Sequence, residues 1–134
     1  MKDIIIVTSK TENLQIVEKY VEDFSASHSI DKDVYGNLLI AALEATNNAI
    51  MHGNQLIESK NVELTFAKDD NKVVLTVSDE GPGFDYKSLP DPTAPENIEN
   101  VNGRGVFLMS KLSDKIEFEN NGSFVKMTFF LNKK

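Results

Sequence analysis

A carboxylate and a carboxamide stand four residues apart in the middle of the sequence, at Glu44 and Asn48. On a helix this spacing places them roughly 40° apart around the axis, so both side chains share one face. A glutamate can accept a proton from an attacking hydroxyl group, and an asparagine oxygen suits a magnesium ion held mostly by water and phosphates. The pair indicates hydroxyl activation beside a metal–phosphate group, although a solvated polar helix face would give the same pattern.

An aspartate followed by glycines forms the second candidate site. Asp79 comes directly after a run of apolar and β-branched residues, and Gly81 and Gly83 permit positive φ angles or close approach to the backbone. A carboxylate at the end of a strand could accept a hydrogen bond from an exocyclic amine, while the glycines would let a flat ring lie against the backbone. An acidic β-turn containing Pro82 is the alternative interpretation.

A second glycine pair, Gly103-Arg104-Gly105, comes just before a short apolar run. The N-terminus of a helix presents unpaired N–H groups, and glycines let an anion come close to them. With the charge of Arg104 added, this is a candidate phosphate site, and a simple loop-to-helix junction is the alternative. The motif is neither a Walker A loop, since no Gly-Lys-Ser/Thr follows, nor a Rossmann fingerprint, since no strand leads directly into it.

The elements that must carry these residues follow from hydrophobic patterning and turn signals. We expect strands at residues 3–9, 62–66, 73–77, 115–118 and 124–131. A first helix should begin after a Thr11 cap, and a third should cover 103–112. The second helix should run from Asp31 or Asp33 to about His52, where Gly53 ends it. Residues 86–102, with their prolines and acids, should form a loop. The order of elements and the expected hairpins predict an α+β two-layer sandwich, with a mixed, mainly antiparallel sheet and helices on one face.

The helix that carries Glu44 and Asn48 should turn an apolar stripe toward the sheet. Leu39, Leu43 and Ile50 mark this stripe on the helical wheel, together with Thr46. Glu44 and Asn48 point away from it, and a flank of alanines beside them would let another group approach the helix closely. Those alanines are Ala41, Ala45 and Ala49.

Composition limits the classes of function. The 134 residues carry a formal net charge of −7, which argues against a general nucleic-acid-binding surface but not against a nucleotide pocket. The chain has no cysteine, which excludes disulfides, thiolate nucleophiles and cysteine-ligated metals. The early apolar run Ile4–Val7 is too short for a signal sequence or a membrane span. We therefore expect a soluble, cytoplasmic protein that forms a single domain over residues 1–134.

Taken together, the three motifs resemble those of the GHKL ATPase superfamily in order and spacing. EATNNAIMHGN, at residues 44–54, resembles the N-box; DEGPG, at 79–83, resembles the G1 box; and GRG, at 103–105, resembles the G2 box. The form of the N-box, and DPTAPEN at 91–97 leading into GRGVFLM, look most like the anti-sigma-factor serine kinases of bacterial partner-switching systems. The resemblance covers nearly the whole chain.

This resemblance implies a Bergerat-type fold and a role for each motif. Glu44 would be the general base, Asn48 would hold Mg2+, and Asp79 would bind the amine of adenine. Residues 86–102 would form the ATP lid. Further nucleotide contacts would come from Gly81, Gly83, Gly103, Arg104, Gly105 and Ser123. At the last of these positions the family often has threonine. Ser123 differs from it but retains a hydroxyl group.

The resemblance also implies an activity. The expected protein is an ATP- and Mg2+-dependent serine/threonine protein kinase and anti-sigma factor. It would phosphorylate a STAS-domain anti-sigma-factor antagonist, sequester a sigma factor and form a homodimer, with no direct nucleic-acid or membrane partner. The alternative is a non-catalytic binding module gated by ATP. The catalytic domain of a sensor histidine kinase is less consistent with the form of the N-box, and His52 at the helix end is better explained by packing or capping than by catalysis.

Overall fold

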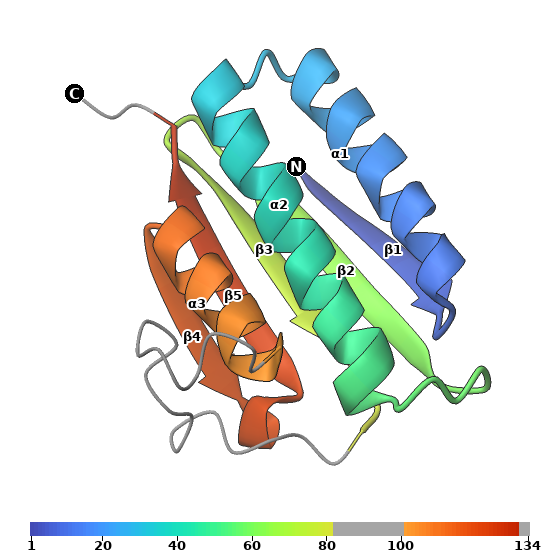
Figure 1. Ribbon diagram of the computed structural model, residues 1–134. Helices are drawn as coiled ribbons and strands as arrows, with labels where there is room; N and C mark the ends of the chain where they lie inside the picture. The colour runs from blue at the N-terminus through green and yellow to red at the C-terminus, as the bar shows by residue number, and fades with distance from the viewer. Residues whose placement is uncertain (82–100, 132–134) are drawn as a thin grey trace.

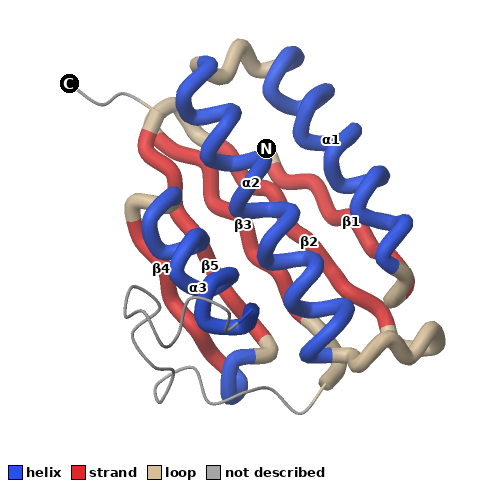
Figure 2. Tube along the Cα trace, in the orientation of Figure 1, coloured by secondary structure: helices blue, strands red, loops and turns tan. Residues whose placement is uncertain are grey.

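The computed structural model describes residues 1–81 and 101–131, in which five strands form one sheet in the order β1-β2-β3-β5-β4. Three helices cover one face of this sheet, which gives the two-layer arrangement expected from the sequence (Figures 1 and 2). The strands are β1 (Lys2–Thr8), β2 (Asn61–Lys68), β3 (Lys72–Ser78), β4 (Lys115–Glu119) and β5 (Phe124–Phe130). The helices are α1 (Leu14–Ser27), α2 (Lys32–Asn48) and α3 (Val101–Leu112), with short turns η1 (Thr11–Asn13), η2 (Ala49–Gly53) and η5 (Asn120–Gly122).

Every pairing within the described sheet is antiparallel, so the parallel component of the expected mixed sheet does not occur among these strands. Both predicted hairpins are present. The Asp69 carboxylate accepts hydrogen bonds from the backbone N–H of Asn71 and of Lys72, which closes the turn between β2 and β3. Positive φ angles at Asn120 (52°) and Gly122 (91°) allow the tight connection between β4 and β5.

The core lies between the sheet and the helices. Alternate residues of β2, β3 and β5 turn inward, and α1 contributes residues at helical spacing. The fully buried side chains include Val17, Val21, Leu38, Ile50, Val62, Leu64, Phe66, Val73, Leu75, Met109 and Met127. Burying each large side chain contributes roughly 1.5–3 kcal/mol, so this layer holds α2 firmly against the strands that end at the site.

The start of α1 differs from the prediction. Thr11 does not cap the helix but lies in the 3-10 turn η1, and α1 begins at Leu14. Asn13, the residue before α1, turns its amide back and donates to the backbone oxygen of Thr8. The connection from β1 into the helix is therefore fixed by a bond to the strand rather than by a side-chain cap.

The buried face of α2 also differs from the prediction. Leu39 and Leu43 are only partly buried, whereas Leu38 is fully buried. Thr46 and, in η2, Ile50 are fully buried, as predicted. The rest of the buried face is formed by Val34, Ala41, Ala42, Ala45 and, in η2, Ala49. The alanines flank Glu44 and Asn48 as expected, but they pack against the sheet, because small side chains let the helix lie close to it. The start of α2 is as predicted, since the Asp31 carboxylate accepts from the N–H of Asp33.

The far end of α2 widens into a π-helical turn, η2, and the helical segment ends at Gly53, as predicted. The Asn54 N–H donates to the backbone oxygen of Ala49, five residues earlier, at 2.7 Å.

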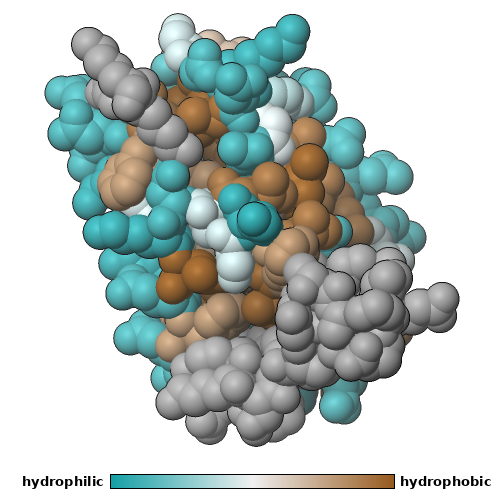
Figure 3. All heavy atoms as spheres, turned by 60° about the vertical axis from the view of Figure 1, so that its left-hand side comes forward, coloured by the Kyte–Doolittle hydropathy of each residue, from teal (hydrophilic) through white to brown (hydrophobic). Residues whose placement is uncertain are grey.

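Several hydrophobic residues that pack against the core are only partly buried. Figure 3 shows apolar surface on the side of the molecule that carries α3. In the part of the chain that the structure describes, no helix is long and apolar enough to cross a membrane.

Candidate functional site

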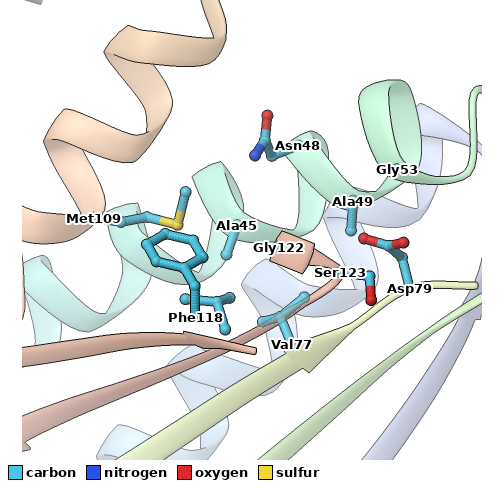
Figure 4. Close-up of a pocket in the computed structure, with 11 residues that line it drawn as sticks. Ala45, Asn48, Ala49, Gly53, Val77, Asp79, Met109, Phe118, Gly122 and Ser123 are labelled. Atoms are coloured by element: carbon cyan, nitrogen blue, oxygen red, sulfur yellow. The ribbon is translucent and has the colours of Figure 1, made fainter. Parts of the chain in front are cut away.

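A narrow pocket opens between α2, η2, the end of β3 and the β4–β5 hairpin (Figure 4). Its lining residues are Ala45, Asn48, Ala49, Gly53, Val77, Asp79, Met109, Phe118, Gly122, Ser123 and Val125. Most of its walls are apolar. The polar groups come from three of the predicted site residues, Asn48, Asp79 and Ser123, which lie far apart in the sequence.

Asp79 supplies the carboxylate of this pocket. It follows β3 by one residue, and because side chains alternate along a strand, it shares a face with Val77. Its Oδ1 accepts a hydrogen bond from the N–H of Gly81 at 2.8 Å, and its own N–H donates to the oxygen of Ser123 at 2.9 Å. Partial burial raises the pKa of the Asp79 carboxyl above its usual value, against the lowering effects of the Gly81 hydrogen bond and of Lys60.

Two glycines leave room for this carboxylate. A Cβ atom on Gly53 would overlap the Asp79 carboxylate, and a Cβ atom on Gly81 would overlap the carbonyl oxygen of Gly53. At Gly53 and Gly81 the end of α2 and the turn after β3 therefore approach too closely for a side chain on either glycine. Gly53 was expected from the sequence only to end the helix, and in the structure it also lines the pocket.

Glu44 and Asn48 lie on the side of α2 that meets α3. Both are half-buried, and Asn48 lies at the rim of the pocket and points away from the sheet (Figure 4). The Glu44 carboxylate lies close to Gly105, because a Cβ atom there would stand 3.5 Å from Glu44 Oε2. The candidate base and the second glycine motif, sixty-one residues apart in the sequence, are thus neighbours in space.

The second glycine motif lies inside a helix. Helix α3 begins at Val101, two residues before the predicted start, so Gly103 and Arg104 belong to its first turn. The first four N–H groups of an α-helix have no partner within the helix and can bind an anion. The backbone therefore suits the predicted phosphate contact, whereas Gly83 and the predicted lid at 86–102 lie outside the described residues, except for the lid's last two positions.

Ser123 lies in the pocket, as predicted, but its hydroxyl group donates to the backbone oxygen of Asn120 at 2.9 Å. In Figure 4 the hydroxyl oxygen of Ser123 points away from the Asp79 carboxylate. A hydroxyl oxygen still has lone pairs for a water molecule, so the predicted contact with adenine through water stays a prediction.

The pocket suits a flat base with a hydrogen-bond donor. Apolar side chains would contact the two faces of a ring, and Asp79 would accept from an amine at its edge. The cavity has a volume of about 20 Å³, room for about one water molecule, so a base needs lining side chains to shift. Met109 and Phe118 lie at the end opposite Asp79 (Figure 4), and the unbranched Met109 is well suited to such a change.

Among the described residues, no cluster of three or more His, Asp or Glu side chains could hold a metal ion. Of the described residues, Asn48 is the one at the rim that we assign as an oxygen ligand. This fits Mg2+, which retains water and takes most other oxygens from substrate phosphates.

Sequence analysis missed most of the pocket's apolar lining, including Val77, Met109 and Phe118. One signal was available for Val77, since strand alternation puts it beside Asp79 on the same face. The other two depend on how α3 and β4 pack, which no local pattern shows.

Comparison with known proteins connects this geometry to a family. The family model described as "Histidine kinase-like ATPase domain" matches residues 7–129. The chain is 26% identical over 133 residues to "Serine-protein kinase RsbW" of Bacillus licheniformis, covering 94% of this chain and 83% of that protein. It is 30% identical over 105 residues to the protein of the same name from Staphylococcus aureus (strain JH9), covering 71% of this chain and 65% of that one.

A solved structure shares the fold. The crystal structure of the RsbU and RsbW domains of Rv1364c from Mycobacterium tuberculosis superposes with a TM-score of 0.67 at 14% identity. The alignment covers 97% of this chain but only 32% of that one, so this chain corresponds to about a third of it. The expected α+β fold and the resemblance to GHKL-type serine kinases are confirmed by these matches.

Proposed function

The chain belongs to the family of histidine kinase-like ATPase domains, and from this premise we propose that it is a serine/threonine protein kinase that uses Mg-ATP. One observation carries the proposal. The Glu44 carboxylate lies next to Gly105 of α3, one helical turn from Asn48, which in turn shares a pocket with Asp79. The candidate general base, the candidate Mg2+ ligand and the candidate group for adenine recognition are thus neighbours along α2 and the pocket beside it. The names of the relatives, serine-protein kinases, support the same activity.

Each residue has a defined task in this proposal. Asp79 accepts a hydrogen bond from the amine of adenine, and the apolar walls of the pocket hold the ring. The oxygen of Asn48 would hold Mg2+, and the ion would supply positive charge beside the phosphates. The N–H groups at the start of α3, including those of Gly103 and Arg104, face the phosphate oxygens. Gly81 and Gly105 have no side chains, so neighbouring groups can lie close to the backbone at these two positions.

The transfer step needs little covalent chemistry from the protein. Glu44 takes the proton from a serine or threonine hydroxyl group of the partner protein, while the oxygen of that hydroxyl group forms a bond to the γ-phosphorus. The bond between that phosphorus and the oxygen of ADP breaks, and ADP leaves with the electron pair. Positioning and electrostatic stabilisation account for most of the rate enhancement in such reactions.

For the protein substrate we propose a small STAS-domain anti-sigma-factor antagonist, and for the sequestered partner a sigma factor. The form of the N-box and the similarity to RsbW proteins over most of the chain support this assignment. The same resemblance supports a homodimer. A cytoplasmic location follows from the proposed use of ATP and of a sigma factor.

The test compares wild type with Glu44→Gln, using γ-labelled Mg-ATP in extract of the source organism. Glu18→Gln, an exposed substitution on α1, is the matched control. We expect a labelled small protein with wild type and with Glu18→Gln, and loss of label by at least a hundredfold with Glu44→Gln, because general-base catalysis contributes about 10²–10⁴-fold.

Thermal denaturation with Mg-ATP shows whether each variant still binds nucleotide. A clear ATP shift in all three proteins, with no labelled product from wild type, would instead support the ATP-gated binding module. Normal transfer by Glu44→Gln would contradict the assignment of the base.

A further inference from the structure

We propose that Asn54 is a positioning residue that fixes Asp79 for recognition of the base, and this proposal rests on the nucleotide site proposed above. Asn54 follows η2 directly and is fully buried, with 0% of its surface exposed. A buried amide needs partners for its polar atoms, and here those partners lie in the turn after β3, just after β1 and at the start of β2.

The oxygen of the Asn54 side chain serves the turn that carries Asp79. Oδ1 accepts a hydrogen bond from the N–H of Glu80 at 2.8 Å. That N–H belongs to the peptide group that joins Asp79 to Glu80. The peptide group on the other side of Asp79 is also held, since the Asp79 N–H donates to Ser123 at 2.9 Å. Both peptide planes that flank Asp79 are therefore fixed, one of them by Asn54.

The nitrogen of the same side chain serves the scaffold. Nδ2 donates to the hydroxyl oxygen of Ser9, just after β1, at 2.9 Å and to the backbone oxygen of Asn61, at the start of β2, at 3.0 Å. The Ser9 hydroxyl in turn donates to the backbone oxygen of Lys60 at 2.6 Å. One amide thus anchors the turn after β3 to two other strands.

Contacts beside Asn54 leave the carboxylate little freedom of its own. Gly53, the preceding residue, lies against both the Asp79 carboxylate and Gly81. The position of the carboxylate therefore depends on how the turn sits against the end of α2. Loss of the Asn54–Glu80 hydrogen bond removes one of the contacts that hold this turn, without removing any group that touches the nucleotide. The Asp79 N–H bond to Ser123 and the bond from the Asn61 N–H to the Glu80 carboxylate would remain.

The predicted consequence concerns selectivity between bases. Inosine triphosphate carries a carbonyl oxygen where ATP carries the amine, so a correctly placed Asp79 should reject it strongly. A misplaced carboxylate should discriminate less. The ratio of the two dissociation constants is informative because partial unfolding affects both nucleotides equally, so a merely structural role of Asn54 would leave the ratio unchanged.

The experiment measures the dissociation constants of ATP and inosine triphosphate by calorimetry for wild type and three variants. Asn54→Ala removes the bond to Glu80 and should lower the selectivity ratio about tenfold. Ser9→Ala disrupts only the scaffold side of the network and should keep the ratio within about twofold, although it lowers the melting temperature. Asn54→Asp retains an acceptor for Glu80 and loses the donors, so it too should keep the ratio within about twofold. A lowered ratio in this variant would contradict the proposal even if Asn54→Ala does not fold.

The outcomes separate this proposal from the proposed function. Suppose that wild type selects ATP over inosine triphosphate. An unchanged selectivity ratio in Asn54→Ala would then overturn the role of Asn54. So would a ratio that falls in Ser9→Ala or in Asn54→Asp as far as it falls in Asn54→Ala. Equal binding of ATP and inosine triphosphate by wild type, or no binding of either, overturns the nucleotide site itself and the Asn54 proposal with it.

Discussion

Replacing Asp79 with asparagine should weaken ATP binding and at the same time stabilise the protein without nucleotide. Burial raises the pKa of this carboxyl, so its negative charge costs free energy in the folded state. Between the usual value of 3.8 and the raised one, the folded protein binds more protons than the unfolded chain. The free energy of unfolding therefore falls as pH rises through this window and stays lower at neutral pH. Asparagine removes that cost.

The loss of ATP affinity can be estimated from the hydrogen bonds. Asp79 Oδ1 already accepts from Gly81 at 2.8 Å, so the oxygen of an asparagine would take this place and its NH₂ group would face the base. A donor would then meet the amine of adenine, and a charge-assisted hydrogen bond would be lost. Such bonds contribute about 1.5–3 kcal/mol, which corresponds to roughly 10- to 150-fold weaker binding.

Calorimetric titration with ATP and thermal denaturation without nucleotide check both effects. Asp23→Asn is the control, because Asp23 is exposed on α1 and pairs with Lys19 on the surface, at 3.2 Å. In wild type, ATP binding should weaken as pH falls toward the raised pKa of Asp79, whereas binding to Asp79→Asn should not follow that transition. A variant that melts lower than wild type and binds ATP equally well would refute the reasoning.

Two glycines give further predictions of opposite sign. Gly81→Ala should lower the melting temperature and weaken ATP binding at least tenfold in the same calorimetric assay, since its Cβ would overlap the backbone oxygen of Gly53 and displace the turn. Gly36→Ala should raise the free energy of unfolding by about 1 kcal/mol in urea denaturation, because Gly36 lies inside α2 and a Cβ there meets no atom within 4 Å. A stabilised Gly81→Ala or a destabilised Gly36→Ala would contradict the packing described for that position.

Local signals predicted the elements well because the interactions that form them are local. The turn at Asp69 closes through bonds to residues two and three positions ahead. The β4–β5 connection likewise needs positive φ angles at Asn120 and Gly122, residue types that adopt them readily. Such features depend on neighbouring residues alone, and the sequence predicted them at the right places.

The face of α2 was predicted less well because burial depends on distance to the sheet as well as on hydrophobicity. A helical wheel favours leucine over alanine, so it selected Leu39 and Leu43. In the structure the helix lies close to the sheet along its alanines, which leaves those leucines at the edge. This close packing also places Ala45 and Ala49 in the pocket wall, so the same alanines serve both the core and the site.

The motifs indicated which residues belong to the site, but not what holds them there. Asn54 stands in the first motif without a role that spacing could assign. Its role depends on Glu80, twenty-six residues away, and on Ser9, forty-five residues away. A hydrogen bond between such distant residues leaves no periodic signal in a single sequence, and only the folded arrangement reveals it.

The surroundings of Asp79 explain why its anchor should be an uncharged amide. A lysine or arginine at position 54 would lower the pKa of the carboxyl and remove the cost of its burial, but it would also compete with adenine as a partner. Asn54 instead accepts from the neighbouring peptide and leaves the carboxylate charged, partly buried and without a cation in direct contact among the described residues. The free energy that burial costs the protein without nucleotide would be recovered when the amine of adenine donates to this carboxylate, as proposed. The same carboxylate should thus lower the stability of the nucleotide-free protein and raise its selectivity for ATP.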